Sequence, residues 1–270
     1  MTAPDRPAWD PHQYLRHADH RTRPFHDLLA RVGDLPGHPE PRIADLGCGA
    51  GNVTALLAGR WPRARITGYD TSREMLAEAT AHARPPHLDF AEADAATWQP
   101  TETYDLIVST AALQWIPDHA DRFPRWIDAL APGGTFAFQV PGNFTAPSHT
   151  LLAGLRETDR WRPLLHGVGD RTAAVLEPAD YLTRLQDLGC TADVWETTYL
   201  QTLHGDDAVL DWVKGTALRP VLTALADDPA ARDAFTAAYR DLLRAAYPPG
   251  PHGTLFPFRR IFAVARKDQP

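Results

Sequence analysis

The residues whose spacing most suggests chemistry form a glycine-rich turn. Gly47, Gly49 and Gly51 stand at alternate positions after the short apolar run 43–46, which predicts a buried strand, and residues 52–61 then predict a helix. Glycine is needed where the backbone takes a positive φ or comes close to a ligand, because it has no Cβ. Such turns bind nucleotide-like ligands in doubly wound α/β proteins. The alternative is a turn with only a structural role.

The details of this turn discriminate among such ligands. A dinucleotide fingerprint would place its third glycine where Asn52 stands, and no Lys-Ser or Lys-Thr pair follows as in a P-loop. Asp45, just before the turn, suits a cation better than a pyrophosphate, for example the ammonium of a methionine moiety. The segment Asp45-Leu-Gly-Cys-Gly-Ala-Gly51 resembles the first motif of class I S-adenosylmethionine-dependent methyltransferases.

Two further acids follow the next two predicted strands. Residues 65–70 end in Asp70, where dinucleotide folds place an acid that accepts hydrogen bonds from ribose hydroxyls. Residues 88–92 precede Asp94, which can accept from the adenine exocyclic amine, and Trp98, which either packs on the ring or belongs to the core. The predicted cofactor-binding residues are Asp45, Gly47, Gly49, Gly51, Asp70, Thr71, Met75, Asp94, Ala95 and Ser109.

An alternating pattern of strands and helices must position these residues. Strands are predicted at 43–46, 65–70, 88–92, 104–109, 135–140, 191–203 and 259–266, with a turn at 131–134. Further helices are predicted after Ser72 as N-cap, at 120–130 and at 177–188. The fold class is therefore α/β, with a Rossmann-like, seven-stranded, mostly parallel methyltransferase sheet and helices on both faces.

Other segments are predicted to be additions to this core. Helices starting at Asp10 and at Pro24 would form an N-terminal arm, which is either a solvated charged face or a lid over the cofactor. Helical residues 149–165, and 206–247 split at Pro220 and Pro229, are expected to build a helical cap. The predicted boundaries are 1–41 for the arm, 42–142 for the cofactor-binding core, 143–176 for the first insertion, 177–204 for the core continuation, 205–255 for the second insertion and 256–270 for the final strand and tail.

Composition narrows the class of partner. Lys and Arg total 27 and Asp and Glu total 34, and the net charge of −7 argues against nucleic acid. An anionic substrate must then meet a local basic pocket. Cys48 and Cys190 form no metal pattern, no apolar run reaches membrane-spanning length, and the start shows no signal-peptide core. We expect a cytoplasmic monomer or homodimer without metal or membrane, acting on a small anion.

Several motifs resemble the trans-aconitate 2-methyltransferase family over about residues 9–266. They are Trp9-Asp-Pro-x-x-Tyr14, Arg21-x-Arg23-Pro24, Ala111-Ala-Leu-Gln-Trp-Ile-Pro-Asp-His119, Gln139-Val-Pro-x-Asn143, Pro147-Ser-His149 and Trp212-Val-Lys-Gly-Thr-x-Leu-Arg-Pro220. Two departures from the family pattern are Ala50, where proline is common, and the proline-rich segment 247–254, which leaves the acceptor acid open.

The resemblance implies transfer of a methyl group from S-adenosylmethionine to a carboxylate of trans-aconitate, giving a monomethyl ester and S-adenosylhomocysteine. A carboxylate with a pKa near ~4 is ionised at pH 7 and needs no general base, so we predict positioning residues but no acid–base catalyst. The predicted substrate-binding residues are Tyr14, Arg21, Gln114, Trp115, Asn143, His149, Lys214 and Arg219, with Arg23, Arg259 and Arg260 as further cations. Alternatives are a methyltransferase for another small acid or secondary metabolite, and a non-catalytic S-adenosylmethionine-binding regulator.

Overall fold

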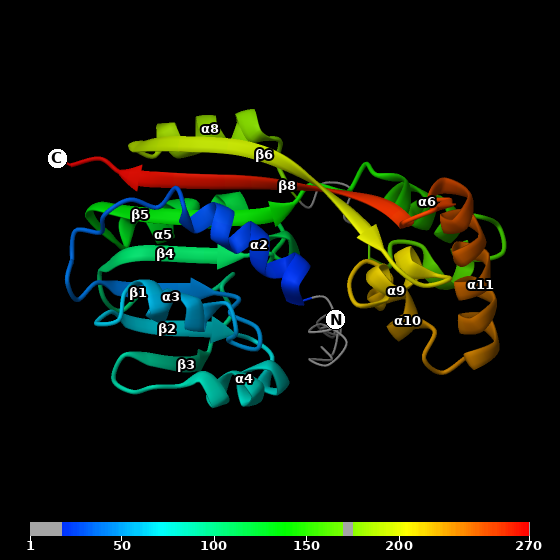
Figure 1. Ribbon diagram of the computed structural model, residues 1–270, viewed down its shortest axis with the longest axis horizontal. Coiled ribbons are helices and arrows are strands. Elements are labelled where there is room, and N and C mark those ends of the chain that lie inside the picture. Colours follow the sequence, from blue (N-terminus) through cyan, green and yellow to red (C-terminus); the bar gives the residue numbers. More distant parts are fainter. Residues whose placement is uncertain (1–17, 170–174, 270) are drawn as a thin grey trace. The chain divides into compact units, whose positions relative to one another are not determined.

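A computed structural model describes residues 18–169 and 175–269, which fall into two compact units (Figure 1). The sheet unit contains the described residues of 9–141, 174–197 and 260–270. The helical unit contains those of 142–173 and 198–259. Each unit is described by itself below.

The sheet unit is built on a central, mostly parallel sheet. The strands are β1 (Arg42–Leu46), β2 (Arg65–Asp70), β3 (Leu88–Glu92), β4 (Tyr104–Thr110), β5 (Leu130–Pro141), β6 (Cys190–Leu203) and β8 (Gly253–Lys267), of which β6 belongs to this unit up to residue 197 and β8 from residue 260 on. They lie in the order β3-β2-β1-β4-β5-β8-β6, as Figure 1 shows, and a short strand β7 (Pro249–Gly250) pairs with β8. β1 is parallel to β2 and β4, whereas β8 is antiparallel to β5. The predicted seven-stranded sheet is confirmed.

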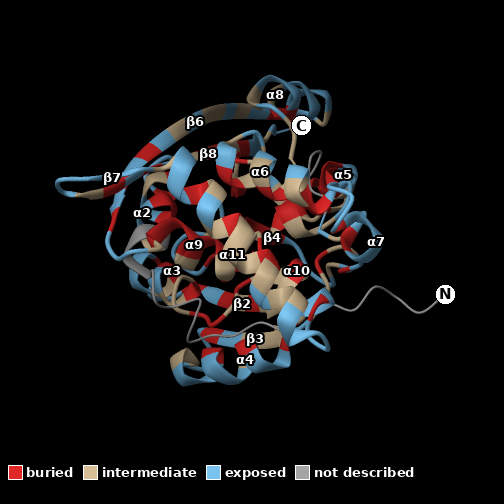
Figure 2. Ribbon diagram, turned by 90° about the vertical axis from the view of Figure 1, so that its right-hand side faces the viewer, coloured by how far each residue is buried: buried red, intermediate tan, exposed pale blue. Residues whose placement is uncertain are grey.

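The core of this unit follows the central strands. Residues 104–109 of β4 are all buried, as expected for a parallel strand covered on both faces. The buried positions coloured red in Figure 2 include β4. Phe123, Phe136 and Phe138 contact one another in this core, with ring centroids 5.1 to 5.3 Å apart.

Helices cover the sheet. They are α2 (Ala18–Leu29), α3 (Thr54–Arg60), α4 (Arg73–Ala79), α5 (Phe123–Asp128) and α8 (Pro178–Asp187), with the short 3₁₀ segments η1 (Thr80–His82), η2 (Leu113–Trp115) and η3 (His119–Arg122). The predicted N-cap is confirmed, because the Ser72 hydroxyl accepts a hydrogen bond from the Met75 amide at 3.2 Å. α2 packs on β5, and α4 packs on β2 and β3.

Three local predictions were wrong. α2 runs through Pro24 instead of beginning there, because Phe25 and Leu28 bury the helix against the sheet and outweigh the missing backbone donor. The single helix expected at 120–130 is instead two segments, η3 and α5. They follow Asp118, whose φ is 49°. The turn at 131–134 belongs to β5, where the pairing with β4 shifts register between Tyr104 and Leu106. The helix expected to start at Asp10 lies outside the described residues.

The helical unit has its own apolar core. Its helices are α6 (Pro147–Arg156), α7 (Arg162–Leu165), α9 (Ala208–Lys214), α10 (Arg219–Ala224) and α11 (Pro229–Ala246). α11 packs on α6 and α9, and the core includes Trp161 against Phe235, with ring centroids 5.2 Å apart. Breaks at Pro220 and Pro229 are confirmed, since each proline lies in the first turn of a helix. The single helix predicted at 149–165 is wrong, because it divides into α6 and α7. No helix in the described chain is long and apolar enough to cross a membrane.

Candidate active site

The glycine turn lies at the point where the sheet changes direction. From β1 the chain proceeds through β2 to β3 on one side, and β4 and β5 follow on the other side of β1. In such sheets the carboxyl ends of the two central strands diverge into a crevice that binds ligands. The turn after β1 and the segment after β4 are therefore neighbours by topology.

The three glycines of the turn have distinct functions. All take positive φ, at 78° for Gly47, 55° for Gly49 and 76° for Gly51. A Cβ on Gly47 would lie 2.2 Å from the Ala112 Cβ, so this glycine lets the turn contact the segment after β4. A Cβ on Gly51 would also collide, at 2.8 Å from the Phe90 ring. A Cβ on Gly49 would meet nothing within 4 Å, which leaves open space where a ligand can approach the backbone.

Asp70 is held in place by two backbone amides. Its Oδ2 accepts from the Gly49 amide at 2.9 Å, and its Oδ1 accepts from the Ser72 amide at 2.9 Å. The side chain is only partly buried. Each carboxylate oxygen has a further lone pair, so the fixed group can still accept hydroxyl donors such as those of a ribose.

Asp45 is sealed from solvent instead of facing it. The residue is 1% exposed, and the Thr54 hydroxyl donates to its Oδ2 at 2.6 Å. Its Oδ1 is buried and accepts no hydrogen bond from any residue that the structure describes. Burial raises the pKa of Asp45 to about 7, the Thr54 bond opposes this shift, and the charge of Asp70 adds to it. Because Asp45 is buried, its charge would act on a bound cation at a distance unless the turn opens.

Acids and small residues at the ends of β2 and β3 complete the predicted cofactor set. Asp94 is partly buried, and its Oδ1 accepts from the Ala96 amide at 2.9 Å. Thr71 is partly buried beside Asp70, while Met75 and Ala95 are buried at 4% and 9% exposure. These residues come from the carboxyl ends of adjacent strands and from the helix that follows β2.

Two sequence-predicted contacts belong to the protein interior. Ser109 is fully buried, and its hydroxyl donates to the Leu46 carbonyl at 2.7 Å, which joins β4 to β1. Trp98 packs between Tyr69 and Tyr104, with ring centroids 5.3 and 5.5 Å away. The core alternative for Trp98 therefore holds, and the Ser109 hydroxyl is already used.

The segment after β4 is conformationally strained. Ala111 has a φ of 52°, which costs an alanine about 1 kcal/mol. The Ala111 amide donates to the Gln139 carbonyl at 2.9 Å, and the Gln114 side-chain amide donates to the Ala111 carbonyl at 2.5 Å. These bonds fix Gln114, which is buried, and place the partly buried Trp115 in the next position. Sequence reasoning missed Ala111, because nothing in an alanine indicates a left-handed conformation.

His119 anchors the far end of this segment. Its Nε2 lies 2.7 Å from the Tyr181 hydroxyl of α8. Burial lowers the pKa of His119 to about 4, so the ring is neutral at pH 7. The contact is a structural link between the segment and α8.

The remaining substrate candidates divide between the units. Gln114 and Trp115 lie in the sheet unit, whereas Asn143, His149, Lys214 and Arg219 lie in the helical unit. Arg260 is in the sheet unit and Arg259 in the helical unit. Tyr14 lies outside the described residues, as do the side chain of Arg21 and the first helix of the arm. Arg23 is exposed on α2.

Most candidates in the helical unit already contact other protein groups. The Asn143 Oδ1 accepts from the Arg259 amide at 2.6 Å, which ties the loop after β5 to β8. The His149 Nδ1 lies 3.1 Å from the Ser148 hydroxyl. The Lys214 ammonium donates to Asp211 at 3.2 Å. Arg219 is partly buried, and its Nε has no hydrogen-bond partner in the described part of the chain.

Comparison with known proteins decides the family. Residues 43–134 match the family described as "Methyltransferase domain". A trans-aconitate 2-methyltransferase of Streptomyces coelicolor is 66% identical over 97% of this chain and 88% of its own. One of Streptomyces avermitilis is 62% identical over 97% and 98%, and one of Mycobacterium tuberculosis is 44% identical over 95% and 96%. The chain belongs to the trans-aconitate 2-methyltransferase family. It is thus an enzyme of the class I S-adenosylmethionine-dependent methyltransferases, as the glycine turn predicted.

Solved structures support the same fold for this family member. The YcgJ protein of Bacillus subtilis superposes with a TM-score of 0.58 at 16% identity, covering 91% of this chain and 99% of its own. YjhP of E. coli superposes with a TM-score of 0.54 at 20% identity, covering 93% and 98%. At these identities the likeness establishes the fold alone.

Proposed function

We propose that this family member methylates a carboxylate of trans-aconitate, using S-adenosylmethionine, to give a monomethyl ester. The observation that carries the proposal is the 66% identity to a trans-aconitate 2-methyltransferase along 97% of the chain. The proposal includes a cytoplasmic protein, a monomer or homodimer, that acts on a small anion without nucleic acid or membrane. The net charge of −7 supports the exclusion of nucleic acid.

The sheet unit supplies the groups for the methyl donor. The open face of Gly49 fits a ligand close to the backbone, the fixed carboxylate of Asp70 suits ribose hydroxyls, and Asp94 suits the adenine amine. Asp45 in its ionised form would favour a cation such as the methionine ammonium, and that cation would in turn oppose the raised pKa of this buried carboxyl. When bound, the donor would supply a methyl group on its sulfonium sulfur. Transfer of that methyl group to the acceptor leaves S-adenosylhomocysteine.

The acceptor side requires orientation and not proton transfer. A carboxylate with a pKa near ~4 is ionised at pH 7, so its oxygen can attack without a base. Gln114 and Trp115 carry neutral N–H groups, which can hold a carboxylate without removing its charge. Among the cations, Lys214 is already paired with Asp211, which makes Arg219 the stronger candidate. Rate enhancement would come from positioning and exclusion of water.

A panel of small acids tests the proposal. Methyl transfer from labelled S-adenosylmethionine should be much faster to trans-aconitate than to cis-aconitate, citrate, isocitrate or a monocarboxylate control. Preference for a different acid would keep the methyltransferase class and replace the substrate. Binding of S-adenosylhomocysteine without transfer to any acid would favour a non-catalytic role.

A further inference from the structure

Arg156 is a buried arginine whose Nε has no acceptor among the described residues. It is the last residue of α6 and is only 6% exposed. Its Nε is sealed from solvent without a hydrogen-bond partner. Among the described residues, no ion pair to an acid involves its guanidinium. A buried charge is costly unless it is paired, so this position requires an explanation.

The guanidinium of Arg156 approaches the start of α10. A Cβ on Gly169 would lie 3.8 Å from the Arg156 Nη1 and 3.0 Å from the Pro220 Cβ. The tip of Arg156 and the Pro220 ring therefore both lie beside the position that a Gly169 side chain would occupy. Pro220 follows Arg219, the first residue of α10.

Arg219 shares the unusual property of Arg156. It is partly buried, and its Nε is also sealed from solvent without a hydrogen-bond partner. The adjacent residue, Pro220, is the one that approaches Gly169 and hence the Arg156 tip. Two arginines with unmet donors thus belong to one region of the helical unit.

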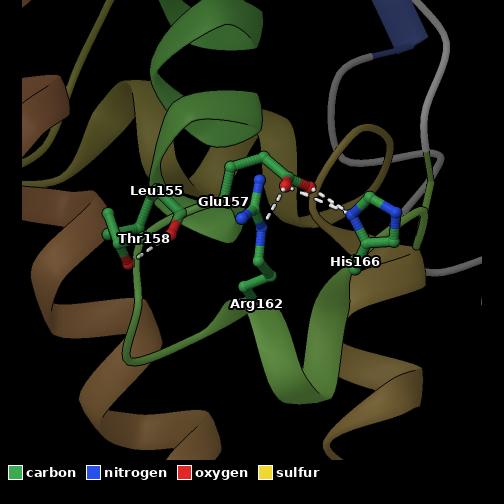
Figure 3. A network of polar contacts seen from close by, with 5 residues as sticks. All are labelled: Leu155, Glu157, Thr158, Arg162 and His166. Carbon is green, nitrogen blue, oxygen red and sulfur yellow. Dashed lines mark hydrogen bonds and ion pairs between the residues drawn. The ribbon is translucent and has the colours of Figure 1, made fainter.

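Several other cations of the same unit are paired with acids. Figure 3 shows Arg162 donating to Glu157 at 3.1 Å, with His166 on the same carboxylate. Lys214 lies 3.2 Å from Asp211, and Arg244 lies 2.8 Å from Asp207. These three more exposed cations are therefore paired with acids of the protein, whereas no described acid pairs with the buried Arg156.

We propose that Arg156, assisted by Arg219, binds the carboxylates of the acceptor acid that do not react. This inference rests on the proposed function and deepens it. An acid with three carboxylates presents two charges besides the reacting one, and each needs a partner once water is excluded. The planar guanidinium binds a carboxylate through two parallel hydrogen bonds. Arg156 is then a specificity-determining residue that favours polycarboxylates over monocarboxylates.

A structural alternative makes the opposite prediction for the free protein. A cation in the last turn of a helix is stabilised by the helix dipole. If that were the function of Arg156, its removal would lower the melting temperature of the ligand-free protein. If Arg156 instead binds a substrate carboxylate, Arg156→Gln should leave the melting temperature of the ligand-free protein unchanged or raise it, because an unpaired buried charge is removed.

The test combines kinetics with ligand-induced stabilisation. Arg156→Gln should raise the KM for trans-aconitate at least about 30-fold, because a charged hydrogen-bonded pair is lost. The KM for S-adenosylmethionine should not change. The upward shift in melting temperature that trans-aconitate causes in the presence of S-adenosylhomocysteine should disappear. Arg156→Lys keeps the positive charge but removes the planar guanidinium that can donate two parallel hydrogen bonds, so its KM for trans-aconitate should be intermediate.

Arg162→Gln is the matched control, because Arg162 is a neighbouring arginine whose acceptor is Glu157. Its KM should stay within about twofold of the parent, as expected for an exposed ion pair. A KM for Arg156→Gln within threefold of the parent would overturn the inference while leaving the proposed function intact. Failure of the parent protein to methylate any tricarboxylate would overturn both, and the acid panel detects that separately.

Discussion

Two equally buried arginines behave differently in the two units. Arg260 of the sheet unit is 5% exposed, and its Nη1 donates to the Gln139 Oε1 at 2.8 Å. Arg156 of the helical unit is 6% exposed and donates to no described residue through its sealed Nε. Arg260 thus has an acceptor within the protein. In our proposal, the acceptor of Arg156 is a carboxylate of the substrate.

The acids of the cofactor site, like Arg260, form hydrogen bonds with other groups of the protein itself. Both carboxylate oxygens of Asp70 accept backbone amides, and the Thr54 hydroxyl donates to Asp45. Asp70 is therefore preorganised by hydrogen bonds of the protein, whereas only one oxygen of Asp45 is satisfied among the described residues. A preorganised group needs little further ordering when a ligand binds, so little binding free energy is lost there. A buried donor without an acceptor destabilises the ligand-free protein, so a ligand that supplies the acceptor binds in preference to one that does not.

The largest effect should come from breaking the preorganised turn. Gly47→Ala places a methyl group 2.2 Å from the Ala112 Cβ at a φ of 78°. We expect a loss of several kcal/mol in unfolding free energy, or loss of S-adenosylhomocysteine binding by calorimetry. Gly33→Ala is the control, since a Cβ there meets nothing within 4 Å. Unchanged affinity in Gly47→Ala would show that the turn is not rigid.

The pH dependence of stability should reveal the buried acid. The folded pKa of Asp45 is raised to about 7 from the 3.8 of a free carboxyl, so the native state holds a proton that the unfolded chain releases. Stability of the ligand-free protein should then fall as pH rises from 4 through 7, by up to roughly 4 kcal/mol. Asp45→Asn should remove this part of the slope, measured by thermal melting across that range.

Bound S-adenosylmethionine sharpens the same measurement. Its ammonium should favour the ionised carboxylate and lower the pKa of Asp45, which flattens the slope in the parent protein. An identical slope with and without the ligand would show that Asp45 does not sense the cation.

The smallest effect compares the two arginines directly. Arg260→Met leaves the buried Gln139 oxygen without this donor and should cost about 1–3 kcal/mol in urea unfolding. Arg156→Met is the same change of residue type, and it should leave the free energy of unfolding of the ligand-free protein unchanged or raise it. Equal losses in both variants would remove the distinction between the units.

The sequence by itself determined the sheet and its cofactor turn. Glycines at alternate positions, the apolar run 104–109 and Ser72 as a helix cap act over a few residues, so their structural meaning can be read locally. The family motifs also predicted Gln114 and Trp115 as substrate-binding residues, whereas the left-handed Ala111, whose carbonyl accepts from Gln114, carries no local signal.

Only the tertiary structure decided which polar groups are satisfied. Ser109 donates to Leu46, 63 positions away, and the tip of Arg156 and the Pro220 ring both lie beside the place of a Gly169 Cβ. Lys214 was a sequence candidate and Arg156 was not, yet Lys214 is paired with Asp211, whereas the buried Arg156 Nε has no hydrogen-bond partner among the described residues. Residue types show which groups can bind a carboxylate, but burial and pairing depend on chain segments that meet only in the fold, and these determine which groups still need one.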